Sequence, residues 1–310
     1  MITFLVRRLI QFIPTLLGVT LIIFILLNVM PGDAALLSGN PRGGTDPKVI
    51  EALREKWGLN DPLPIRYVRF LGNLVKGDLG ISFRLDRKVS EVINERLFVT
   101  LRLATCGMLF AVIGGVGLGF FSAIHQGSAF DIIAMIGAVT GMSIPNFWLG
   151  LMLMYLVGVL LGILPTSGYG GGDLAHLILP AFTLGVRYMA LLARMSRSAV
   201  LDVVHEDYVN TARSKGLAER VVQFRHIFRN ALIPVITIAG LQFGGMLAST
   251  VVVETVFSWC GIGSLLVESI FRRDVPVLQG CILIIVVAFL VINLLVDLAY
   301  GYLDPRIQYD

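Results

Sequence analysis

The sequence predicts an all-α polytopic membrane protein, with six transmembrane helices and a small helical external subdomain between the first and second of them. Of its 310 residues, 56% are hydrophobic and only 15% are charged, whereas soluble globular domains carry about 25% charged residues. Mean hydropathy is +0.81. The net charge is +4, but the basic residues are clustered: of 25 Lys and Arg, eleven lie in 31–98 and seven in 194–232.

Six apolar runs are long enough to cross a hydrocarbon core of about 30 Å. They cover residues 9–30, 101–124, 132–164, 177–195, 232–256 and 280–302. We interpret the first as a retained helix, because a cleaved signal peptide would have a shorter apolar region and a small-residue cleavage site. The third run is too long for one upright span, and we expect Pro145 to kink a single tilted helix there.

Three segments follow from these spans. Residues 1–30 form the N-terminus and first helix, 31–98 the external subdomain, and 99–310 a core of five helices with a cytoplasmic loop at 197–232. Helices are expected at 45–57, with Pro47 near the start and Gly58 at the stop, and at 67–75. Short loops rich in Lys and Arg face the cytoplasm. Arg7, Arg8 and the basic 194–232 segment therefore place both termini and this loop in the cytoplasm.

The polar stretch 206–234 carries helical signals of its own. Tyr208, Thr211 and Ala212 recur at helical spacing, and Gly216 suits a helix end in the left-handed conformation. A second amphipathic helix follows, and Pro234 is expected at the first position of the next apolar helix. Two short helices joined at a glycine would make a rigid knob on the membrane surface. The alternative is a solvated basic loop held by lipid headgroups.

Polar residues inside the spans are candidates for a translocation pathway, because burying them in lipid is costly. Arg187 lies mid-span and is the main candidate, with Gln242 and Asn146 as further ones; Asn293 and Asp297 fit a structural or gate-lining role.

The glycines at 114, 115, 117 and 119, and Gly244 with Gly245, predict close helix packing rather than a phosphate loop. Three cysteines without C-x-x-C spacing predict neither a disulfide framework nor a metal site. We expect no cofactor and no metal.

Several motifs resemble a known family. Asn210-Thr211-Ala212-x-x-x-Gly216, followed by Leu232-Ile233-Pro234, resembles the cytoplasmic EAA loop of permease subunits in bacterial ABC importers. The motif E-D-Y-V-x-T-A-R-x-K-G-L, followed by R-N-A-x-x-P, is similar to the corresponding sequence in the dipeptide, oligopeptide and nickel branch of that family. Asn210 and Thr211 depart from the general EAA letters, and the gap to the proline is longer. Pro31-Gly32-Asp33 and Asp304-Pro305-Arg306 extend the resemblance almost end to end.

The resemblance implies a permease subunit of the bacterial inner membrane, working by alternating access. Its implied partners are a second homologous permease, two ABC ATP-binding subunits that carry the ATPase, an external substrate-binding protein and membrane lipid, with no nucleic acid. Di- or oligopeptides are the expected substrates, and nickel or metal chelates or glutathione are alternatives. Ala212 is expected to face the ATPase. The implied coupling residues are Asp207, Tyr208, Asn210, Thr211, Ala212, Lys215, Gly216 and Leu217.

An intramembrane enzyme and an ion-coupled secondary transporter are the alternatives from other classes of protein. An intramembrane enzyme needs a nucleophile with a base, or carboxylate or histidine clusters. None of the four His lies centrally in a span, and no spans share paired acids. An ion-coupled secondary transporter would show internal repeats and broken helices at the midplane, and no convincing repeat is present.

Overall fold

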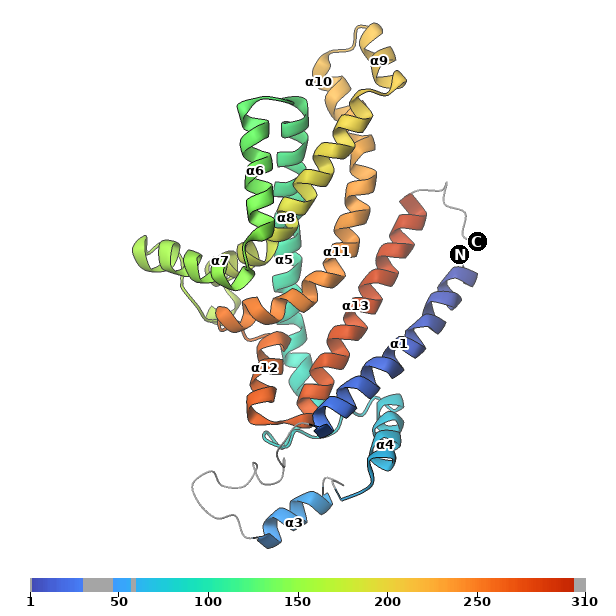
Figure 1. Cartoon of the computed structure of the whole chain (residues 1–310), viewed down its shortest axis with the longest axis vertical. Coiled ribbons are helices and arrows are strands. Elements are labelled where there is room, and N and C mark those ends of the chain that lie inside the picture. The colour runs from blue at the N-terminus through green and yellow to red at the C-terminus, as the bar shows by residue number, and fades with distance from the viewer. Residues whose placement is uncertain (1, 30–46, 57–59, 304–310) are drawn as a thin grey trace. The chain divides into compact units, whose positions relative to one another are not determined.

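The computed structural model describes residues 2–29, 47–56 and 60–303 (Figure 1). Within these ranges all regular structure is helical, apart from one isolated bridge between Ile81 and Lys88. The contacts divide the chain into two units, one made of residues 1–99 and 261–288 and the other of residues 100–260 and 289–310. The helices α5 (Val89–Ile124) and α13 (Val275–Leu303) each contribute residues to both units.

The all-α polytopic membrane architecture is confirmed. Five helical segments are long and apolar enough to cross a membrane, or six if one bent pair counts as a single span. These segments are Val6–Asn28 within α1 (Ile2–Val29), α5, α8 (Leu174–Val204), the continuous helix Glu219–Val256 and Val275–Ala299 within α13.

The expectation of one tilted helix around Pro145 is wrong. Here α6 (Ala129–Ser143) and the pair α7 (Asn146–Leu153) and η1 (Met154–Leu160) meet at an angle of 108°. A residue before proline avoids the helical region, and Ile144 accordingly has an extended backbone, with φ −75° and ψ 127°. Pro145 is extended as well, so the chain turns sharply rather than kinking within one helix.

The first unit contains the helices predicted between the first two spans. α3 (Pro47–Lys56) and α4 (Leu63–Val75) are both present, and α4 starts earlier than expected because Pro62 and Pro64 suit a helix N-terminus. A core of Val89, Val92 and Ile93 on α5 packs with α12 (Ile262–Arg272) and the start of α13. α12 lies between the predicted spans 232–256 and 280–302, where we predicted no helix from the sequence. The stop at Gly58 and the motifs at 31–33 and 304–306 lie outside the described residues.

In the second unit, glycines bring α5 directly against α8, as predicted. A Cβ on Gly119 would lie 2.3 Å from the carbonyl oxygen of Ala193, and one on Gly115 would lie 2.6 Å from that of Met189. Gly117 faces open space instead, with nothing within 4 Å of the same position. Only residues without a side chain permit this backbone approach.

The glycine pair in α11 (Arg229–Val256) has two different environments. A Cβ on Gly244 would lie 3.0 Å from the ring of Phe289 and 3.1 Å from the amide oxygen of Asn293 on α13. Gly245 has nothing within 4 Å. Close packing is therefore confirmed for Gly244 and not for Gly245, and Asn293 lies at a helix contact.

We expected Pro234 at the start of its helix, but it lies inside α11. The helix begins at Glu219 and continues through α10 (Glu219–Val221) and the π-helical stretch η3 (Val222–Phe228). A proline inside a helix removes one hydrogen bond and costs about 3 kcal/mol. A continuous buried face formed by Val222, Ile227, Ala231 and Val235, each at most 3% exposed, offsets that loss. The five-residue step from Val222 to Ile227 fits the wider π turn.

Candidate functional site

The segment expected to couple to a partner contains one well-formed short helix, α9 (Asp207–Ser214). It ends at Gly216, whose φ of +75° lies in the left-handed region, as predicted. The Gly216 N–H donates to the Arg213 carbonyl at 2.9 Å, and the Leu217 N–H donates to the Ala212 carbonyl at 3.4 Å. This pair of bonds is the Schellman motif, which closes a helix and fixes the direction of the chain that follows.

One face of α9 is buried against the rest of the second unit. Val209 and Ala212 are 0% and 5% exposed. They belong to a core cluster that includes Phe120 and Ala123 from α5 and Val200 from α8. We call these last three residues the α9 packing surface. We expected Ala212 to face a partner, and this expectation is wrong. Its small side chain is buried and lets α9 pack closely on the chain itself.

The other face of α9 and the turn after it are exposed. The Tyr208 hydroxyl accepts a hydrogen bond from the Asn230 side chain at 3.0 Å. Arg213 and Glu219 form an ion pair of 3.0 Å across the Gly216 turn, and the hydrogen bond to Glu219 raises the pKa of Arg213. Of the expected coupling residues, the exposed ones are Asp207, Tyr208, Asn210, Thr211, Lys215, Gly216 and Leu217.

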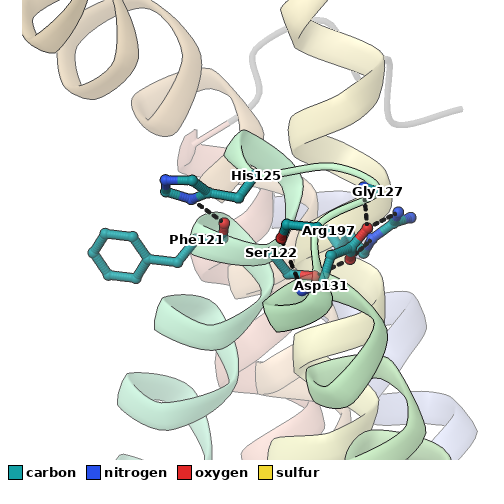
Figure 2. Close-up of polar contacts among 7 residues, drawn as sticks. Phe121, Ser122, His125, Gly127, Asp131 and Arg197 are labelled. Atoms are coloured by element: carbon teal, nitrogen blue, oxygen red, sulfur yellow. Dashed lines mark hydrogen bonds and ion pairs between the residues drawn. The ribbon is translucent and has the colours of Figure 1, made fainter.

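A buried carboxylate lies beside the same end of α5 and α8 (Figure 2). Asp131 is only 4% exposed. Its two carboxylate oxygens accept hydrogen bonds from Nε and Nη2 of Arg197, at 2.7 Å and 2.8 Å. It also accepts the Ser122 hydroxyl and the Gly127 N–H, the latter at 2.9 Å. We call these four residues the Asp131 cluster. The charge is thus fully paired and hydrogen-bonded, as a buried charge must be.

Sequence reasoning missed the Asp131 cluster. Ser128 caps α6 by accepting the Asp131 N–H at 3.2 Å, and a serine three residues before an acid is a recognisable helix start. That signal would have placed Asp131 in a first turn. It would not have identified Arg197, which lies 66 residues further along the chain.

The predicted pathway residues are not joined to one another. Arg187 is exposed on α8, Gln242 is half-buried on α11, and Asn146 is the first residue of α7 after the bend. In the part of the chain that the structure describes, no hydrogen bond or ion pair links any two of these residues.

Sequence reasoning also missed a fully buried acid near the end of α11. Glu254 is 0% exposed, and its carboxylate accepts the Thr100 hydroxyl of α5 at 2.6 Å. Glu254 could have been identified from the sequence, because it is the only acidic residue within the apolar stretch 232–256.

The described ranges 2–29, 47–56 and 60–303 were searched for groups of side chains that could bind a metal ion and for disulfide bonds. No group of three or more His, Cys, Asp or Glu there could hold a metal ion. None of Cys106, Cys260 and Cys281 forms a disulfide bond, and Cys260 is exposed.

Comparisons with known proteins match the whole chain. Residues 115–309 match the family described as binding-protein-dependent transport system inner membrane component, and residues 1–104 match its N-terminal counterpart. The glutathione transport system permease protein GsiC of Pectobacterium atrosepticum is 44% identical over 309 residues, covering 100% of both chains. The protein of the same name from Salmonella typhi is 41% identical with the same coverage.

Solved structures share the fold at low sequence identity. The inward-facing MetNI methionine ABC transporter aligns with a TM-score of 0.59 and 15% identity, covering 69% of this chain and 97% of that one. An amino acid ABC transporter with histidines aligns with a TM-score of 0.54 and 17% identity, covering 69% of this chain and 94% of that one.

Proposed function

The chain belongs to the family of inner membrane components of binding-protein-dependent transport systems, as a permease subunit of an ABC importer, and we propose that this importer takes up glutathione. The observation that carries the proposal is the end-to-end similarity to permeases named for glutathione transport. Glutathione was an alternative in our sequence interpretation. The relatives favour it over the di- or oligopeptides that we expected first, and over nickel.

The exposed face of α9 is the proposed contact with an ATP-binding subunit. This face presents hydrogen-bonding groups, and the turn after it exposes the apolar side chain of Leu217, which is 42% exposed. Two ATP-binding subunits, a second permease and an external binding protein complete the proposed transporter. ATP would close the ATP-binding subunits on each other, and α9 would carry that motion into α5, α8 and α11. Substrate crosses as the spans open alternately to each side.

Arg187, Gln242 and Asn146 are the proposed pathway residues. Arg187 has the strongest physical support, because its exposed guanidinium on the spanning helix α8 forms no hydrogen bond or ion pair with any described residue. A charge in a membrane span needs an acceptor or water. Glutathione carries two carboxylates, either of which could be attracted to it. Arg187→Leu should then reduce uptake while the complex still assembles, and loss of assembly would indicate a structural role instead.

The proposed orientation places both termini and the 197–232 loop in the cytoplasm, and 31–98 outside. It rests on the basic residues at Arg7, Arg8 and 194–232. We expect a membrane-impermeant maleimide to modify a cysteine at Val75, which is 89% exposed, but not one at Ser214, in intact cells. The native cysteines must first be replaced, since Cys260 is exposed. Modification of the Ser214 cysteine alone would reverse the topology.

Transport by the reconstituted complex tests the function. Proteoliposomes holding this permease with its partner subunits should accumulate labelled glutathione when ATP and the binding protein are supplied. Excess dipeptide or Ni²⁺ should not compete. The purified chain alone should not hydrolyse ATP, because it has no G-x-x-x-x-G-K-[ST] phosphate loop. ATP-driven uptake of a dipeptide but not of glutathione would refute the proposed substrate and leave the importer assignment in place.

A further inference from the structure

The Asp131 cluster and the α9 packing surface occupy the same turns of α5 and α8. Ser122, which donates to Asp131, lies between Phe120 and Ala123 on α5. Arg197 lies one turn before Val200 on α8. The polar cluster therefore joins the two helices at the level where α9 packs on them.

The bonds of this cluster constrain the three elements that meet there. The paired contacts from Arg197, at 2.7 Å and 2.8 Å, fix both the distance and the rotation of α8 relative to α6. Ser122 attaches the end of α5, and the Gly127 N–H attaches the turn between α5 and α6. Burial of the carboxylate excludes water that could substitute for a lost donor. Figure 2 shows these donors converging on Asp131 from α5, the turn and α8.

Close backbone contact extends the same connection. A Cβ on Gly119 would lie 2.9 Å from the backbone nitrogen of Arg197, so α5 and α8 already touch where the ion pair forms. The Ser196 hydroxyl donates to the Val116 carbonyl at 3.4 Å across the same contact. A force applied to α9 would then move α5 and α8 together and would not slide one helix past the other.

We propose that Asp131 and Arg197 are a positioning pair for energy coupling, holding the α9 packing surface rigid so that force on α9 moves α5, α6 and α8 as one body. The inference rests on the proposed function, because it requires that α9 receive the force of ATP hydrolysis. This role requires neither residue to contact the substrate or the ATP-binding subunit. They act through α9.

Arg197→Lys is the sharpest test, since lysine keeps the charge but cannot reproduce the two-pronged contact. Asp131→Asn is the second variant, which keeps the shape of the carboxylate and removes its charge. The matched control is Arg87→Lys, which alters the Arg87–Glu95 pair of 2.6 Å. That pair is also held by two hydrogen bonds but is exposed and lies in the other unit.

Uptake and ATP hydrolysis should be measured on the same proteoliposomes. We expect the ratio of substrate transported to ATP hydrolysed to fall at least fivefold in Arg197→Lys and Asp131→Asn, and to stay unchanged in Arg87→Lys. A purely structural role would lower both activities in proportion to the amount of assembled complex. An unchanged ratio in both cluster variants would overturn the proposal.

A second readout does not depend on the substrate. Amide hydrogen exchange across 207–214 should accelerate in the purified Arg197→Lys permease, and not in Arg87→Lys, because α9 would lose its rigid support. Unaltered exchange in α9 would refute the positioning role even if no transport were detected. Absence of ATP-driven uptake by the wild-type complex would instead count against the proposed function alone.

Discussion

Replacing Gly119 with alanine is expected to lower the thermal unfolding midpoint of the permease by several degrees and to reduce the amount of assembled complex. The added methyl group would lie 2.3 Å from the Ala193 carbonyl oxygen and 2.7 Å from the Ser196 Cβ. Backbone atoms cannot move away by changing rotamer, so α5 and α8 must separate. Overpacking of this kind costs about 1–3 kcal/mol. The measurement is thermal unfolding of the purified variant in detergent.

Gly117 supplies a control on the same helix. A methyl group there meets nothing within 4 Å, and alanine is intrinsically favoured over glycine in a helix by about 1 kcal/mol. Gly117→Ala should therefore unfold at or slightly above the wild-type temperature. Equal melting of the two alanine variants would mean that α5 and α8 do not approach each other as closely as the structure shows.

The positions of the spans could be predicted because each apolar run has to cover the thickness of a bilayer. Breaks within runs were harder. Pro145 was correctly identified as the point of change, but composition cannot distinguish a kink from a turn of 108°, since both begin with the same backbone restriction. At Pro234 the error was the reverse, because we predicted a helix start where the helix in fact continues. The buried face from Val222 to Val235 carries the helix through it.

The candidate site was only half accessible to sequence reasoning. Gly216 was predicted correctly, because its left-handed conformation depends on a residue type and its immediate neighbours. Ala212 was assigned to the wrong face, because the choice depends on contacts with Phe120 and Val200, which are distant in sequence. The Arg197 partner of Asp131 was missed for the same reason, since an ion pair across 66 residues leaves no local pattern.

Gly216→Val is expected to separate ATP hydrolysis from transport. Valine in the left-handed conformation costs more than the roughly 1–2 kcal/mol of an ordinary L-residue, because its branched Cβ is the least tolerant. The strain is conformational, since no atom lies within 4 Å of an added Cβ. The turn should relax by breaking the Leu217 bond to Ala212. The exposed face of α9 would then lose its fixed direction, so hydrolysis should continue while uptake per ATP falls severalfold.

Gly77 makes this prediction decisive, because it has the same φ of +75° and equally open surroundings but lies in the other unit. Gly77→Val therefore introduces comparable backbone strain away from α9. Both variants should lose a similar amount of thermal stability, and only Gly216→Val should lower the ratio of uptake to hydrolysis on reconstituted complexes. If the two variants kept the same ratio, the loss would be one of general stability, and the turn at Gly216 would serve only to connect α9 to α10.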